Sequence, residues 1–163
     1  MVGGEGLVGS SAAVGMKVSQ HRALVQGAGS AMRMTAASLR KEFDASLALR
    51  RGVLRFAHAL MGQIAQTAAC NRFHNAEMRL ARWLLVTRDR LRSESFCLTH
   101  QFLSLMIGVR RVGVTKAAGG LQRRKLIRYH RGSITILGRR GLEAASCGCY
   151  RAAQNVYDRF LGQ

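Results

Sequence analysis

The 163-residue chain contains no proline and only eight acidic residues. No acidic residue lies between Glu94 and Glu143, whereas ten lysines and arginines lie between Arg110 and Arg140. General acid–base catalysis therefore has few candidate carboxylates. The sequence also shows no paired nucleophile and base, no metal-binding triad and no Walker-type phosphate loop. We therefore do not expect an enzyme.

Long apolar runs are missing as well. No run of uncharged apolar residues reaches the length of about 18 that a membrane span needs. The glycine-rich start lacks the basic and apolar segments of a secretory signal. We expect no membrane association and a cytoplasmic location. With 48% hydrophobic residues, the chain can bury one modest core, or two small ones joined by a helix.

Cysteine is sparse, and its spacing is not that of a common zinc motif. The four cysteines, Cys70, Cys97, Cys147 and Cys149, form no paired CxxC. Cys147 and Cys149 could ligate a metal or form a redox pair. We favour the simpler interpretation that they are small side chains packed on a helix in a reducing compartment. The sequence thus predicts neither a metal nor another cofactor.

Positive charge dominates what is present, with a formal net charge of +18. Residues 71–163 hold 18 basic and 5 acidic side chains, a net charge of +13, and residues 1–70 contribute only +5. Such a field concentrates a protein near phosphate-rich partners, although it says nothing about the fold. The C-terminal part is therefore expected to bind a polyanion.

The first 42 residues are rich in glycine and small side chains, with short apolar runs such as Ala23–Val25 and Met32–Met34. These runs predict a few β-strands separated by turns. So few strands cannot close a sheet on their own, and an open sheet needs partners for its edges.

Residues 43–70 change to a helical period, with apolar side chains at spacings of four and three. The stripe consists of Leu49, Val53, Ala57, Leu60 and Ile64. Such a stripe packs either in an ordinary core or against a second copy of the helix. Because little other core lies nearby, we favour a parallel two-helix dimer interface.

Two further helices are expected on either side of the most basic region. Asn75 is placed to cap a helix over residues 75–92. A last helix over residues 139–161 carries apolar residues on one side and is expected to pack on the domain before it.

Residues 98–137 predict a helix-turn-helix followed by a hairpin. Thr99 caps a first helix that runs to Met106, and Gly108 allows a tight turn before a second helix over residues 110–125. At 100° per residue, the second helix turns an apolar arc inward. Its opposite arc presents Arg111, Val112, Thr115 and Lys116.

That outward arc suits the major groove of duplex DNA. An arginine can bond to guanine in bidentate fashion, and Val112 could contact a thymine methyl group. Arg110, at the helix start, points better at the backbone. The hairpin over residues 127–137 forms a wing whose Arg128, His130 and Arg131 are placed to touch phosphates.

The segments RLARWLL (Arg79–Leu85) and LTHQFLSLMIGVRR…LQRRKLIRYHRGSITIL resemble the DNA-binding half of the Crp/Fnr family of bacterial transcription regulators. The resemblance implies a homodimer that reads a palindromic site in successive major grooves, with RNA polymerase as a further partner. It assigns base reading to Arg111, Val112 and Lys116, and phosphate contacts to Thr99 and Arg110. The family pattern often has an acid where Val112 stands, so the usual half-site is not implied.

The segment GEGLVGSSAAVG…QHRALVQ (Gly4–Gln26) resembles the end of the family's cyclic-nucleotide-binding β-roll. Arg22 falls near the place of the phosphate-binding arginine, and Ser10 or Ser11 stands where an acid would contact the ribose. The strands expected before Met1 are absent from the sequence, so we expect no cyclic-nucleotide binding. The family's iron–sulfur variants use N-terminal cysteines, and none precedes Cys70.

The expected fold class is α+β, mainly α, in three parts. Residues 1–42 are a truncated β-roll remnant, residues 43–70 a long dimerisation helix, and residues 71–163 a winged helix-turn-helix domain with a C-terminal helix. The expected function is sequence-specific DNA binding by a nucleoid-associated transcription regulator. The alternatives are a non-specific nucleic-acid binder, or a non-functional truncated regulator whose recognition helix is weakened by Gly113, Gly119 and Gly120.

Overall fold

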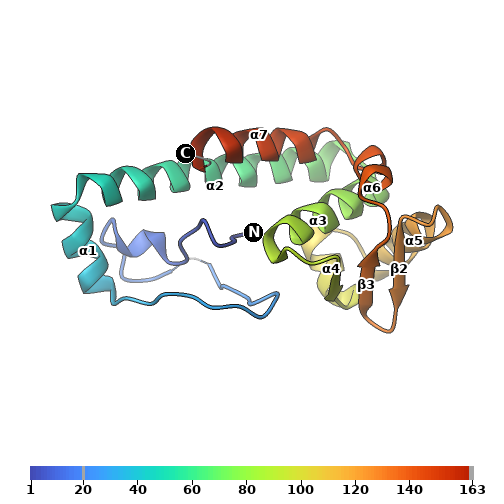
Figure 1. Ribbon diagram of the computed structural model, residues 1–163, viewed down its shortest axis with the longest axis horizontal. Coiled ribbons are helices and arrows are strands. Elements are labelled where there is room, and N and C mark those ends of the chain that lie inside the picture. The colour runs from blue at the N-terminus through green and yellow to red at the C-terminus, as the bar shows by residue number, and fades with distance from the viewer. Residues whose placement is uncertain (20, 162–163) are drawn as a thin grey trace.

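The computed structural model describes residues 1–19 and 21–161, and these form an elongated molecule with a compact domain at one end (Figure 1). The long helix α2 (Leu47–Phe73) and the last helix α7 (Cys149–Leu161) lie side by side along its length. The short 3₁₀ helix η1 (Ser10–Ala12) and helix α1 (Ala36–Ala45) pack near the start of α2.

The compact domain combines four helices with a small sheet. Its elements are α3 (Ala76–Leu91), β1 (Ser95–Cys97), α4 (His100–Ile107), α5 (Arg111–Arg123), β2 (Ile127–His130), β3 (Ser133–Ile136) and α6 (Arg139–Ala145). The three strands are antiparallel in the order β1-β3-β2, and Ile134 on the central strand stands opposite Phe96 and Tyr129. This architecture confirms the expected mainly helical α+β class and the winged helix-turn-helix order.

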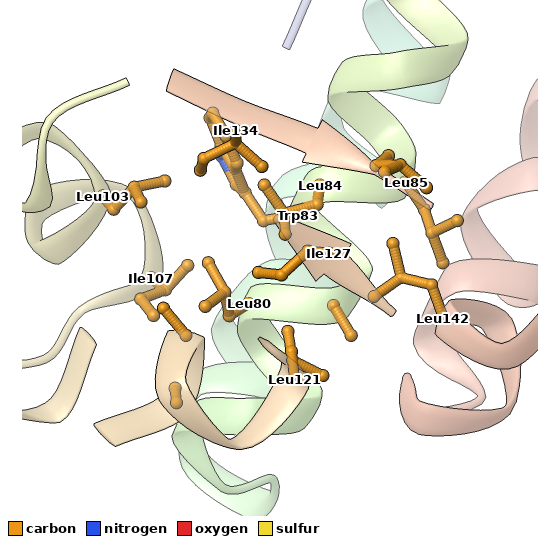
Figure 2. Packing of buried hydrophobic residues seen from close by; sticks show 14 of the residues in the cluster. Leu80, Trp83, Leu84, Leu85, Leu103, Ile107, Leu121, Ile127, Ile134 and Leu142 are labelled. Atoms are coloured by element: carbon orange, nitrogen blue, oxygen red, sulfur yellow. The ribbon is translucent and has the colours of Figure 1, made fainter. Parts of the chain in front are cut away.

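A single core holds this domain together, and every element of the domain except β1 contributes at least one of the side chains labelled in Figure 2. Helix α3 runs through the middle, with Leu80 and Leu84 completely buried. The caps predicted from the sequence are present: Asn75 Oδ1 accepts from the Met78 amide at 2.9 Å, and Thr99 Oγ1 accepts from the Phe102 amide at 3.1 Å. The capping residues therefore mark the starts of the helices whose apolar side chains are buried in the core.

The first 42 residues do not form the predicted strands. Among the described residues of this part, the only regular elements are η1 and the start of α1. Val25 and Met32 are 93% and 99% exposed, so the short apolar runs have nothing to pack against. A strand needs partners for its backbone groups, and none is available here. Helix α1, which we did not predict, starts where Thr35 Oγ1 accepts from the Ser38 amide at 3.0 Å.

The long helix begins and ends later than residues 43–70. Ser46 separates it from α1, and its Oγ accepts from the Leu49 amide at 3.2 Å. Helix α2 then continues to Phe73, and His74 is its C-cap. The helix starts later than predicted because Ser46 caps its N-terminus and separates it from α1, although the sequence pattern on both sides is helical.

The apolar stripe predicted for a dimer interface is largely used inside the chain. Val53 is 7% exposed and packs with Ala13 and Leu39, while the stripe's Leu49, Ala57 and Leu60 are half-buried. Of the predicted stripe, only Ile64 is mostly exposed, at 56%. The sequence pattern identified a packing face, but η1, α1 and α7 cover much of it.

The single last helix predicted over residues 139–161 is two helices. The Ser146 amide is shared between the carbonyls of Leu142 and Glu143, which ends α6, and Gly148 lies in the break. Helix α7 packs mainly along α2 and not only on the compact domain. Its start is anchored by Tyr150, whose hydroxyl donates to Asp89 Oδ2 at 2.7 Å. Burial and this hydrogen bond raise the pKa of Tyr150 well above its ordinary value.

None of the helices in the described part of the chain is both long and apolar enough to cross a membrane.

Candidate nucleic-acid interface

Helix α5 has one buried side and one free side, as the sequence predicted. Val114, Ala117, Ala118 and Leu121 are buried against the core. Arg111, Val112, Thr115 and Lys116 are exposed, with Val112 at 60%. The structure thus confirms that all four predicted residues face outward.

The buried side of α5 depends on close approach to α3. A Cβ added at Gly120 would lie 2.1 Å from Glu77 Oε2, so only glycine fits there without movement of that carboxylate. Glu77 also pairs with Arg124 at 3.0 Å and so ties the end of α5 to α3. One of the glycines that weaken the helix therefore has a packing role.

In the part of the chain that the structure describes, the cations at the start and on the free side of α5 have no acidic partner. Arg110, Arg111 and Lys116 are exposed and form no ion pair with any described residue. Some arginines elsewhere in the domain are paired with a carboxylate, as when Arg88 Nε donates to Glu94 at 2.8 Å. That contact holds the pKa of Glu94 below its ordinary value. The positive field on this face is therefore left for an outside partner.

The two helix starts on this face add further anion-binding groups. Thr99 is exposed at the start of α4, and its Oγ1 already accepts the capping bond while its hydroxyl hydrogen is left free to donate. Arg110 is the N-cap of α5, but no side chain caps the amides of that first turn. Uncapped amides at a helix N-terminus favour a phosphate oxygen.

The wing is a tight hairpin. Arg131 and Gly132 connect β2 to β3 with positive φ angles of 45° and 83°, which is the backbone of a two-residue hairpin turn. Arg128 and His130 are exposed on the outer face of β2, whereas Tyr129 and Ile127 turn inward. The three predicted backbone-contacting residues of the wing are thus all accessible.

His100 joins the wing to helix α5 and was not predicted from the sequence. Its Nδ1 lies 3.1 Å from Thr115 Oγ1, and its ring stacks on Tyr129 with centroids 4.6 Å apart. The Tyr129 amide in turn donates to Gln122 Oε1 at 2.7 Å. Burial and then the charge of Arg111 lower the pKa of His100. No local pattern marks this residue, because its partners come from two other elements, α5 and β2.

Thr115 is less free than its exposure suggests. Its hydroxyl lies 3.2 Å from the carbonyl oxygen of Arg111, to which it donates, in addition to its contact with His100. On the free side of α5, the side chains of Arg111, Val112 and Lys116 therefore remain available to contact a partner.

The residues that resembled a nucleotide cassette lie outside any sheet. Ser10 and Ser11 are in η1, and Arg22 is exposed in a stretch whose described residues form no helix or strand. The strand framework that the resemblance implied for them is therefore wrong in the described part of the chain.

Comparisons with known proteins agree with this geometry. The sequence profile of the Crp-like helix-turn-helix domain matches residues 78–145. No curated protein matches the chain in sequence.

Three solved structures share the fold. FixK2 from Bradyrhizobium japonicum has a TM-score of 0.63 at 16% identity, covering 69% of this chain and 59% of that one. TTHB099, a CRP-family transcriptional regulator from Thermus thermophilus, has a TM-score of 0.55 at 20% identity, covering 62% and 55%. A Crp/Fnr-family regulator from Eubacterium rectale has a TM-score of 0.52 at 19% identity, covering 67% and 51%. The chain thus matches between half and three-fifths of the length of these proteins.

Proposed function

Residues 78–145 form a Crp-like helix-turn-helix domain, and on that premise we propose that the chain is a sequence-specific DNA-binding transcription regulator. One observation carries the proposal. The free side of α5 presents Arg111, Val112 and Lys116 to solvent without any acidic partner among the described residues. A helix with this edge fits the major groove, where base pairs differ in their donors, acceptors and methyl groups.

The residues divide into two roles. Arg111 and Lys116 donate to guanine, and Val112 packs on a thymine methyl group, which together provide sequence preference. Thr115 has a smaller part, because its hydroxyl is engaged by Arg111 and His100. Phosphates are held by the groups that surround α5, which fix the register of the protein on DNA. These are Thr99, Arg110, Arg128, His130 and Arg131.

The dimer of this proposal uses a different side of α2 from the predicted stripe. Leu47, Leu54 and Met61 recur at intervals of seven, and they are 56%, 53% and 63% exposed. Ile64, from the predicted stripe, and Ala68 extend this exposed side. A heptad repeat of this kind packs two parallel helices as a coiled coil. Two domains held this way reach half-sites about one helical turn apart on DNA.

Selection of bound duplexes from a random library tests the proposal. We expect a palindromic consensus, and sedimentation of the same sample should show two chains per duplex. Arg111→Ala should cost about 1–3 kcal/mol of discrimination at one base pair. Arg151→Ala is the matched control, since it removes an exposed arginine from α7. Equal affinity for every duplex at moderate salt would contradict sequence reading.

Non-specific polyanion binding is the second candidate, favoured by the net charge of +18. Competition with unrelated duplex DNA and with RNA separates the two functions. A purely electrostatic binder would be displaced equally by all of these, and its affinity would fall with salt in the same way for each. RNA polymerase would be a partner only if the chain is a sequence-specific transcription regulator.

A further inference from the structure

Three thiols and an imidazole meet where α2 ends and α7 begins. Cys70 and His74 come from the last turn and the C-cap of α2. Cys147 lies in the break between α6 and α7, and Cys149 is the first residue of α7. Their donor atoms all lie within 4.8 Å of one another. Residues 77 positions apart in the chain thus converge on one point.

Two distances within this cluster are close to those of a tetrahedral metal site. The Sγ atoms of Cys70 and Cys147 are 3.5 Å apart, and Cys149 Sγ is 3.6 Å from His74 Nδ1. Zinc–sulfur and zinc–nitrogen bonds of about 2.3 and 2.05 Å at tetrahedral angles require separations of about 3.8 Å between sulfurs and about 3.6 Å between sulfur and nitrogen. The other donor atoms are at most 4.8 Å apart. They would have to approach one another by no more than about 1 Å to complete a tetrahedron around one zinc ion.

The cluster is buried and its surroundings suit thiolate ligands. Cys70 is 0% exposed, and Cys147 and Cys149 are 4% and 6% exposed. Gln66 Nε2 donates to Cys149 Sγ at 3.0 Å, which is the kind of outer hydrogen bond that orients a metal ligand. The partly buried Met78 packs against the three cysteines and shields them from water.

Arg82 supplies a balancing charge. It is 6% exposed, and its Nε has no hydrogen-bond partner among the described residues. Met78, which packs against the three cysteines, and Arg82 are four residues apart on α3, so the guanidinium lies on the side of α3 that faces the cluster. Three thiolates and one divalent ion leave a single negative charge, which a buried arginine can offset.

We propose that Cys70, His74, Cys147 and Cys149 bind one zinc ion in a closed tetrahedral site. Cysteine and histidine are the ligands that structural zinc prefers, and four ligands leave no open position for catalysis. Zinc binding displaces one proton from each of the three thiols, whereas the neutral imidazole contributes a lone pair, and no electron transfer is involved. An iron–sulfur cluster does not fit, because its four ligands are divided between at least two iron atoms, whereas these four donor atoms lie within 4.8 Å of one another around one point.

The ion would add metal bonds to the packing between α2 and α7. It joins the end of α2 to the start of α7, beside the short link between α2 and α3. That link includes the ligand His74 itself. Zinc therefore fixes the direction in which the helix-turn-helix domain leaves the long helix.

The metal content of the full-length chain tests this inference. The chain is purified with a thiol reductant, incubated with zinc and separated from free metal, and its zinc is then measured. We expect about one zinc per chain, as for a single structural site. Replacement by cobalt(II) should give the absorption bands of a tetrahedral thiolate complex. Cys97→Ser is the matched control, because Cys97 is an exposed cysteine on β1.

Variants of the ligands and of their neighbour complete the test. Cys147→Ser should remove most of the bound zinc, while Cys97→Ser retains it. Since Cys147→Ser could also misfold, Gln66→Leu provides an independent measure: it keeps all four ligands and should weaken zinc binding by about tenfold. None of these measurements requires DNA, so their failure and the failure of the proposed DNA binding are distinguishable.

Four outcomes would overturn the inference. The first is a folded chain with four free thiols that takes up no zinc and gives no cobalt bands. The second is a freshly purified chain with a disulfide between Cys70 and Cys147. The third is retention of copper(I) in place of zinc, and the fourth is equal zinc loss from the Cys97→Ser and Cys147→Ser variants.

Discussion

The helix-turn-helix domain and the first 35 residues show two different uses of similar side chains. Both contain small, apolar and basic residues, yet the domain buries Leu80, Leu84 and Leu85 completely, whereas Leu24 and Val25 are 54% and 93% exposed. The difference is periodicity. Apolar residues at helical spacing, with caps at the ends, give faces that can pack together, and scattered pairs do not.

The largest expected effect of a mutation lies in the core of the domain. Leu84→Ala should lower the free energy of unfolding by about 2–5 kcal/mol, because it leaves a cavity around a fully buried side chain. Leu24→Ala removes the same atoms from an exposed position and should change stability by less than about 0.5 kcal/mol. Chemical denaturation of both variants measures the contrast, and equal losses would contradict it.

The exposed side of α2 should matter for assembly rather than for folding. Leu54→Lys places a charge in the proposed coiled coil and should weaken self-association by at least about tenfold, or about 1.4 kcal/mol. Val18→Lys, at a 77% exposed position of the N-terminal part, is the control. Sedimentation over a range of concentrations decides between them. A Leu54→Lys variant that still forms a dimer of unchanged affinity would place the interface elsewhere.

A smaller effect is expected from the glycines of α5. Gly119 has only Arg123 Nη1 near its missing Cβ, at 3.5 Å, so Gly119→Ala should stabilise the domain by about 0.5–1 kcal/mol. Gly120→Ala should gain less or lose stability, because Glu77 must move. Thermal melting of the two variants tests this pair, and Gly29→Ala in the irregular N-terminal part serves as a control.

The smallest effect is a pH dependence that His100 introduces. Its pKa is lowered in the folded domain, so the unfolded chain binds the proton more readily as the pH falls. Stability should therefore be complete above the ordinary histidine pKa of about 6.5 and decrease as the pH drops below it. His100→Gln should flatten the decrease between neutral and mildly acidic pH, and His21→Gln, in the exposed N-terminal part, should not. Melting curves that stay equally steep in the His100→Gln variant would assign the dependence to other groups.

The sequence was most informative where structure is local. The caps Asn75 and Thr99, the turn at Gly108 and the hairpin over residues 127–137 depend on neighbours a few positions away. The exposure of Arg111 and Lys116 followed from helical periodicity alone. Predicting these elements required no knowledge of distant contacts.

The sequence was misleading where a segment's structure depends on what else is nearby. Val53 was assigned to a dimer stripe, but Ala13 and Leu39 cover it within the same chain. Residues 139–161 were predicted to form one helix. They form α6 and α7, and α7 packs along α2 after the break that includes Gly148. The strands expected in the first 42 residues had no partner strands to pair with.

The sequence alone determined the order of α3, α4, α5 and the wing, and the basic, outward edge of α5, because periodicity, caps and turn residues act over a few positions. Only the tertiary structure decided that η1 and α1 cover part of α2, that His100 links Thr115 to Tyr129, and that Cys70 meets Cys147. These are contacts between residues far apart in the chain. They depend on how packed helices are directed in space, which no short stretch of sequence specifies.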